Sequence, residues 1–229
     1  MDDRTIVAAD DAPTFGYLMP VGGAEDRLGK LHVLSRFAAL AGGAEARIIV
    51  IHAASSFGAE VAEAYTRAFS RLGVPPIIAM GPQSRADADN AELAEQLDNA
   101  TGVFMSGGNQ LILATALAGT AIGEAIHRAH RRGAIVGGTS AGASALSEHM
   151  ISLGKNGATP KMRATQLTAG LGLVPNVIID QHFSQRNRIG RLLSTVAVSP
   201  SQLGMGIDED TAVLIAPDGT FEVIGRGVV

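Results

Sequence analysis

Residues 134–144 read AIVGGTSAGAS, an apolar run followed by a glycine-rich turn with Ser140 at its centre. The run predicts a buried strand, and the residues after Ser140 favour the start of a helix. Glycines two positions before and after Ser140 match the nucleophile elbow, a tight turn that exposes the serine hydroxyl. The N–H of Ala141 would then stabilise an oxyanion. The pattern is also typical of a turn that only packs a helix closely against a strand, and this alternative stays open.

Short apolar segments recur along the chain, separated by amphipathic segments. Because the apolar segments are continuous rather than alternating, they predict an α/β fold with an open, mostly parallel sheet and helices on both faces. The expected strands are 17–21, 47–52, 76–80, 102–105, 134–137 and 177–180, and the expected helices are 30–40, 59–72, 90–97, 111–118 and 122–131.

The C-terminal part changes character. Residues 204–209, 211–216 and 221–225 are strand-like, and a Pro-Asp-Gly turn occupies 217–219. These features predict an antiparallel hairpin at the edge of the sheet. The segment 153–172, rich in glycine and threonine, is expected to be a loop and a candidate flap beside the site.

Composition restricts the class of protein. At 229 residues with 46% hydrophobic residues, the chain is expected to form one domain over 1–229. Its net charge of −4 argues against nucleic acid as a partner, and its apolar runs are too short to span a membrane. The absence of cysteine excludes disulfides and thiolate metal ligands. The acidic N-terminus Met1–Arg4 lacks the pattern of an export signal, so we expect a cytoplasmic protein.

A serine nucleophile needs a base, and six histidines are candidates. They are His32, His52, His127, His130, His149 and His182. The first two fall in helix and strand patterns, the next two predict a solvated basic face, and His149 is a minor candidate. His182 is favoured because it follows an expected strand at the carboxyl edge of the sheet, where active sites collect.

Arginines follow His182, and they suggest a pocket for carboxylates. Arg188 and Arg191 lie a helical turn apart, opposite an apolar stripe of Ile189, Leu192, Leu193 and Val196. The alternative is a surface helix with solvated arginines. The group that orients the histidine is one of Asp208, Glu209 and Asp210, and composition does not choose among them.

Five blocks together resemble the cyanophycinase family, serine peptidases of family S51. The blocks are GGAED at 22–26, SGGNQ at 106–110, GTSAGA at 138–143, DQHF at 180–183 with its trailing arginines, and GIDE at 206–209. That family is related to the aspartyl dipeptidases and has the class I glutamine amidotransferase architecture. Its members cleave a polyaspartate polymer with arginine branches, cyanophycin, into β-aspartyl-arginine dipeptides.

The resemblance implies roles for individual residues. Ser140 becomes the nucleophile, His182 the base and Glu209 the orienting acid, with the N–H groups of Gly108 and Ala141 at the oxyanion. It places Asn109, Gln110, Asp180, Gln181, Arg186, Arg188 and Arg191 around the substrate.

The resemblance further implies no metal or organic cofactor, a polymer or aspartyl-arginine peptide as partner, and a homodimer. The alternatives are an aspartyl dipeptidase and a non-catalytic binding module. A general α/β-hydrolase esterase is disfavoured because its acid precedes its histidine, whereas here Glu209 follows His182.

Overall fold

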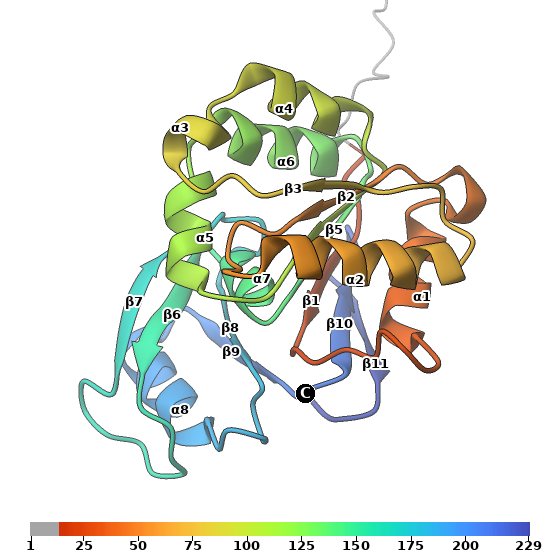
Figure 1. Cartoon of the computed structure of the whole chain (residues 1–229). Coiled ribbons are helices and arrows are strands. Elements are labelled where there is room, and N and C mark those ends of the chain that lie inside the picture. Colours follow the sequence, from red (N-terminus) through yellow and green to blue (C-terminus); the bar gives the residue numbers. More distant parts are fainter. Residues whose placement is uncertain (1–13) are drawn as a thin grey trace, which may run out of the picture.

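A seven-stranded sheet forms the centre of the computed structural model, which describes residues 14–229 (Figure 1). Its strands are β1 (Leu18–Val21), β2 (Ile48–Ile51), β3 (Ile78–Met80), β4 (Gly102–Met105), β5 (Ile135–Thr139), β10 (Thr211–Ile215) and β11 (Phe221–Gly225). The order is β11-β10-β1-β5-β4-β2-β3. The five strands from β1 to β3 are mutually parallel, and β10 and β11 add an antiparallel edge. The predicted α/β class and C-terminal hairpin are confirmed.

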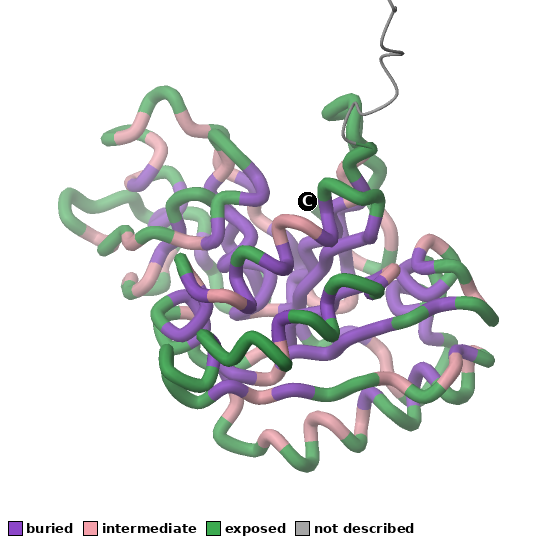
Figure 2. Tube along the Cα trace, turned by 90° about the horizontal axis from the view of Figure 1, so that it is seen from above, coloured by how far each residue is buried: buried purple, intermediate pink, exposed green. Residues whose placement is uncertain are grey.

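Helices cover both faces of this sheet because its strands are apolar at successive positions. Ile49 and Val103 face one core, whereas Val50 and Phe104 face the other. The first core is covered by α3 (Arg85–Ala88), α4 (Ala91–Gln96), α5 (Gln110–Leu117) and α6 (Ala121–Arg131), and the second by α1 (His32–Leu40) and α2 (Gly58–Arg71). Single 3-10 turns occupy Gly43–Glu45 and Leu97–Asn99. Figure 2 shows the buried segments gathered inside and the exposed ones on the outer loops and helices.

A second group of elements lies beside the main sheet. It contains the antiparallel hairpin of β6 (His149–Gly154) and β7 (Thr165–Ala169), the parallel pair of β8 (Val177–Gln181) and β9 (Leu203–Ile207), and helix α8 (Ile189–Val198). Figure 1 shows the hairpin and α8 together at one end of the molecule.

Two expectations for this group are wrong. The segment 153–172 is not one loop, because β7 pairs with β6 and leaves only 155–164 as their connection. The strand at 177–180 does not join the main sheet, because both sides of β5 are occupied, by β1 and β4, and β8 pairs with β9 instead. Glycines in β9 let neighbours approach closely, since a Cβ on Gly206 would lie 2.6 Å from the ring of Phe183.

The histidines of α6 also differ from expectation. His130 is buried and its Nε2 lies 2.9 Å from the carbonyl oxygen of Gly16, while His127 Nε2 lies 2.8 Å from that of Leu171. Burial lowers the pKa of His130 below its ordinary value. The pair therefore holds neighbouring backbone segments and does not form the solvated basic face that the arginine-rich context suggested.

Within residues 14–229, no helix combines the length and apolar character needed to cross a bilayer. The N-terminus Met1–Arg4, from which we expect no export signal, lies outside the described residues.

Candidate active site

The turn between β5 and α7 (Ala141–Ala145) places Ser140 in an unusual backbone conformation. Its φ of 52° and ψ of −109° are rare for a residue with a side chain, and such strain is typical of a nucleophile elbow. A Cβ on Gly138 would lie 2.6 Å from the carbonyl carbon of Gly142, and one on Gly142 would overlap the carbonyl oxygen of Met105. The glycines therefore do pack the helix closely against the strands, and the same packing lifts Ser140 out of the turn.

Ser140, His182 and Glu209 form a continuous hydrogen-bonded chain. Ser140 Oγ lies 2.9 Å from His182 Nε2, and His182 Nδ1 lies 2.6 Å from Glu209 Oε1. The histidine follows β8, and its backbone N–H donates to the carbonyl of Gly22 at 2.7 Å. Gly23, with φ of 105°, lies against the imidazole so closely that a Cβ there would overlap the ring. The Gly22–Gly23 turn after β1 thus fixes the position of the histidine.

The three consecutive acidic residues 208–210 have different hydrogen-bond partners. Glu209 alone of the three bonds His182. Asp208 is buried and accepts from the backbone N–H of Ser184 at 2.9 Å, whereas Asp210 accepts from the N–H of Asp26 at 2.8 Å. The geometry therefore makes the choice that composition left open.

The environment of His182 keeps its imidazole neutral. Burial lowers the pKa of His182 most strongly, the hydrogen bond to Glu209 raises it, and the nearby charge of Arg186 lowers it again. The net result is a pKa below the ordinary histidine value, so Nε2 is free to accept a proton at neutral pH.

Three of the expected substrate residues pair with one another instead of facing solvent. Arg191 Nε donates to Asp180 at 2.6 Å, and Arg188 Nη1 lies 3.4 Å from the same carboxylate. All three side chains are at most 7% exposed. Burial and the charge of Arg191 lower the pKa of Arg188 to about 10, so it remains charged at neutral pH. The interpretation of this segment as a surface helix with solvated arginines is therefore wrong for Arg188 and Arg191.

Helix α8 turns its arginine flank inward. Leu192 is buried as expected, but Ile189 and Leu193, two further members of the predicted apolar stripe, are 40% and 49% exposed. This orientation of α8 follows from Asp180 on β8. A buried carboxylate needs a cationic partner, and Arg191 on α8 supplies one.

Gln181 connects this buried ionic network to the serine. Arg188 Nη1 donates to Gln181 Oε1 at 3.0 Å, and the same oxygen lies 3.4 Å from Ser140 Oγ. Arg186, in contrast, is exposed beside His182. Of the expected substrate residues in this block, Gln181 is therefore the one that contacts Ser140, and Arg186 is the one that remains exposed.

The turn before α5 lies on the other side of the serine. Asn109 caps α5 by accepting from Leu111 N at 2.9 Å, and Gln110 Nε2 donates to the carbonyl of Ile151 at 3.0 Å. Gly108 has a φ of 142° and lies against Ala54, while a Cβ on Gly107 would be 3.9 Å from Ser140 Oγ. The backbone of this turn is therefore beside Ser140, whereas both amide side chains already bond the protein.

A cavity of about 240 Å³ opens above Ser140, and sequence reasoning missed most of its walls. Ala24, Glu25, Arg27, Val61, Tyr65, Ser106, Gly107 and Thr139 line it together with Ser140 and His182. The sequence signal that could have identified these walls is the GGAED block at 22–26, which lies directly after β1 at the carboxyl edge of the sheet.

Glu25 and Arg27 give this cavity its polarity. The Glu25 carboxylate is buried and accepts hydrogen bonds from the hydroxyls of Tyr65 and Thr139. Burial, followed by the charge of Glu25, raises the pKa of Tyr65 well above its ordinary value, so its hydroxyl remains a donor. Arg27 lies over the Tyr65 ring at 5.5 Å, with its side chain 39% exposed, and is the cation that lines the cavity.

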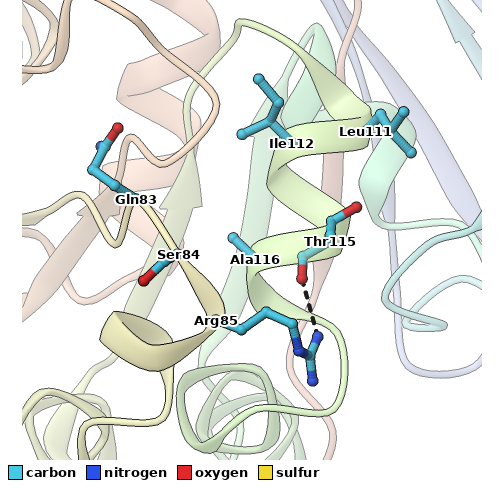
Figure 3. Close-up of a pocket in the computed structure, with 7 residues that line it drawn as sticks. All are labelled: Gln83, Ser84, Arg85, Leu111, Ile112, Thr115 and Ala116. Carbon is cyan, nitrogen blue, oxygen red and sulfur yellow. Dashed lines mark hydrogen bonds between the residues drawn. The ribbon is translucent and has the colours of Figure 1, made fainter.

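A second cavity is lined by residues that hold neighbouring elements together (Figure 3). It lies between α3 and α5, and Arg85 Nη1 donates there to the carbonyls of Thr115 at 3.0 Å and Ala118 at 2.8 Å. Ser84 caps α3. Among residues 14–229, no three histidine or acidic side chains are grouped so that they could hold a metal ion.

A serine on a strand-to-helix turn, bonded to a histidine that is bonded in turn to a carboxylate, defines the class of the serine hydrolases. Within that class, the family model for peptidase family S51 matches residues 18–223. The chain belongs to peptidase family S51 and is a serine peptidase by family, which confirms the resemblance seen in the five sequence blocks.

Similar proteins agree with this assignment. The chain is 39% identical over 213 residues to a cyanophycinase of Trichormus variabilis, covering 93% of this chain and 72% of the relative. It is 41% identical over 215 residues to a cyanophycinase of Synechococcus elongatus, covering 93% and 67%.

Solved structures give the same fold. A peptidase from an acI-B1 Actinobacterium has a TM-score of 0.71 at 25% identity, over 95% of this chain and 90% of that one. A putative peptidase E protein of Listeria monocytogenes has a TM-score of 0.60 at 19% identity, over 94% of this chain and 100% of that one, and it supports the fold alone.

Proposed function

We propose that this chain is an exopeptidase that hydrolyses multi-L-arginyl-poly-L-aspartate and releases β-aspartyl-arginine dipeptides. The proposed substrate rests on the sequence identity of about 40% to cyanophycinases over 93% of the chain. The hydrogen-bonded chain from Ser140 through His182 to Glu209 supports the chemistry.

In the proposed reaction, His182 Nε2 accepts the proton of Ser140 as Oγ forms a bond to the scissile carbonyl carbon. Glu209 holds the Nδ1–H and stabilises the imidazolium. The backbone N–H groups of Gly108 and Ala141 stabilise the oxyanion. His182 then gives its proton to the leaving amine, and a water molecule, deprotonated by the same nitrogen, releases the acyl group from Ser140. This scheme uses no metal and no organic cofactor.

The cavity supports recognition of a carboxylate next to the scissile bond. Arg27 is partly exposed there, and a guanidinium pairs with a carboxylate through two parallel hydrogen bonds. Gln181 and Arg186 lie at the serine and histidine. Asp180, Arg188 and Arg191 act in this proposal by holding Gln181 in place, not by touching the substrate.

We also propose that residues 1–229 form one domain and that the protein works as a cytoplasmic homodimer. Contacts between β8 and the turn after β1 support a single domain. Phe221 and Val223 on the edge strand β11 are 60% and 45% exposed, which supports an apolar contact between copies. Light scattering of the purified protein tests the stoichiometry.

The rival within the same family is an aspartyl dipeptidase. Comparing kcat/KM for the polymer with kcat/KM for short Asp-X peptides separates the two. We expect efficient turnover of the polymer with a dipeptide as the main product. Turnover confined to free dipeptides would favour the rival instead. A binding module without activity would leave both substrates intact and leave Ser140 unlabelled by a fluorophosphonate.

A further inference from the structure

Charge is distributed unevenly along this chain. Residues 149–207, which we call the basic lobe, contain a single acid, Asp180, against six lysines and arginines. The other 21 acids lie outside this segment, although the chain as a whole has a net charge of −4. The basic lobe comprises β6 to β9 and α8, the elements that lie beside the main sheet (Figure 1).

Part of this positive charge is already neutralised. Asp180 is buried and pairs with Arg188 and Arg191. Lys155, Lys161 and Arg163, on the connection between β6 and β7, are exposed. Within residues 14–229, no acidic side chain lies within ion-pair distance of these three cations.

These three cations line one cavity of about 320 Å³, which we call the basic cup. Its walls are Lys155, Asn156, Gly157, Ala158, Thr159, Lys161, Met162, Arg163, Ala164 and Arg191. None of these residues is acidic. A hollow lined by charges of one sign raises the local concentration of counter-ions, so these cations favour the binding of an anion.

The connection that carries the basic cup is seated on α8. Gly157 N donates to the carbonyl of Asn187 at 2.7 Å, and Lys161 N donates to Ser194 Oγ at 2.9 Å. Gly190 is required for this contact, because a Cβ there would lie 2.5 Å from the carbonyl oxygen of Gly157. The backbone that carries the cations is therefore held in place by the fold.

The basic cup and the Ser140 cavity are joined by the buried ionic network. Arg191 lines the cup and bonds Asp180, which pairs with Arg188. Arg188 in turn bonds Gln181, whose Oε1 lies 3.4 Å from Ser140 Oγ. The two cavities share no lining residue, so a ligand long enough to occupy both must extend past the reacting bond.

From this arrangement we propose that the basic cup is a second binding site for the substrate, which takes carboxylate groups of the polymer beyond the unit held at Ser140. The proposal rests on the proposed polymer substrate. Each arginine branch joined through its α-amino group presents a free carboxylate and a guanidinium. The cup pairs with the carboxylates, and the acidic remainder of the chain attracts the guanidinium groups. Such a site raises affinity for long chains without touching the reacting atoms.

Binding is tested without turnover, in protein carrying Ser140→Ala. The probe is fluorescent poly-L-aspartate, and anisotropy gives its Kd at several salt concentrations. Adding Lys155→Gln, Lys161→Gln and Arg163→Gln raises the Kd about tenfold and reduces its salt dependence, because three anion contacts are lost.

The matched control replaces three exposed arginines outside the basic lobe, Arg36, Arg67 and Arg226, which already lie near acids. This control changes the Kd less than about twofold. Equal loss in both triple variants would overturn the proposal, as would an unchanged Kd in the cup variant. Single-stranded DNA that binds the cup as tightly as poly-L-aspartate would also overturn it, since the site would then select any polyanion.

An activity measurement separates this proposal from the proposed function. With Ser140 intact, the cup variant shows a higher KM for the polymer, an unchanged kcat, and unchanged turnover of short Asp-X peptides. If the parent protein does not cleave the polymer at all, the proposed function fails, whereas the binding data still decide whether the cup holds a carboxylate polymer.

Discussion

The main sheet and the basic lobe each supply one half of the reactive pair, and they do so by different physical means. The sheet positions Ser140 through close backbone packing, in which Gly138 and Gly142 leave no room for side chains. The basic lobe carries His182, which the Gly22–Gly23 turn holds in place, and it positions Gln181 through buried charge, in which Asp180 pairs with two arginines. The difference teaches that glycine spacing encodes one half of the site locally, whereas the other half depends on partners far apart in the chain.

The largest expected effect follows from cutting the link between the two halves. His182→Ala removes the base at the junction and should reduce kcat on the polymer by about 10⁵-fold. His149→Ala is the matched control, because His149 is exposed and belongs to the same lobe. Its kcat should stay within about twofold of the parent. Similar losses in both variants would mean that His182 is not the base.

The next effect concerns the orienting acid. Glu209→Gln preserves shape but no longer stabilises the imidazolium, so kcat should fall by about 10³-fold to 10⁴-fold. Asp210→Asn, one residue further on, loses only the side-chain charge beside the N–H of Asp26 and should cost less than about tenfold. Steady-state kinetics at saturating substrate measure both variants. A larger loss for Asp210→Asn would overturn the assignment of Glu209.

Stability should respond differently in the two regions. Asp180→Asn leaves Arg188 and Arg191 as buried charges without a counter-ion, and the free energy of unfolding should fall by about 3 kcal/mol. Asp98→Asn removes a surface carboxylate near Arg128 and Arg132 and should cost less than about 1 kcal/mol. Chemical denaturation measures both. Equal costs would show that the basic lobe does not depend on buried charge.

The cavity on the sheet side gives a smaller effect. Arg27→Met keeps an unbranched apolar side chain but removes the guanidinium that lies over Tyr65, so KM should rise about tenfold with little change in kcat. Arg27→Lys restores the charge without the fork and should recover only part of the affinity. An unchanged KM in Arg27→Met would remove Arg27 from substrate recognition.

The smallest effect is a change in pH dependence. His182 accepts a proton only when neutral, so activity is lost as pH falls through its pKa. Arg186 lowers the pKa of His182, and Arg186→Gln should therefore raise that pKa and move the acidic limb of kcat/KM toward higher pH. Profiles recorded on a short substrate measure the shift, and a move toward lower pH would contradict the account.

The sequence predicted most of the main sheet because its inner strands contain continuous apolar runs, which can be recognised without knowing their neighbours. It also predicted that Ser140 and His182 would meet, since both follow strands at a carboxyl edge. It did not predict that β8 pairs with β9 in a separate sheet, because the place beside β5 opposite β4 is filled by β1, a strand distant in sequence.

The arginines show the same limit of prediction from sequence, here for charged residues. The sequence favours a pocket for substrate carboxylates at Arg188 and Arg191, with a solvated surface helix as the alternative, whereas in the structure both pair with the buried carboxylate of Asp180. Arg27 gave no periodic signal, because its place in the cavity depends on the turn after β1 and on Tyr65 from α2. A local sequence pattern therefore does not predict a residue's role when that role depends on the burial of a distant partner.

The most direct test of the central claim is mass spectrometry of the products after the polymer is incubated with the parent protein and with Ser140→Ala. Circular dichroism first establishes that both are folded. The account predicts β-aspartyl-arginine dipeptide from the parent and intact polymer from the variant. Equal release of dipeptide by the variant, or no cleavage by the folded parent, would contradict it.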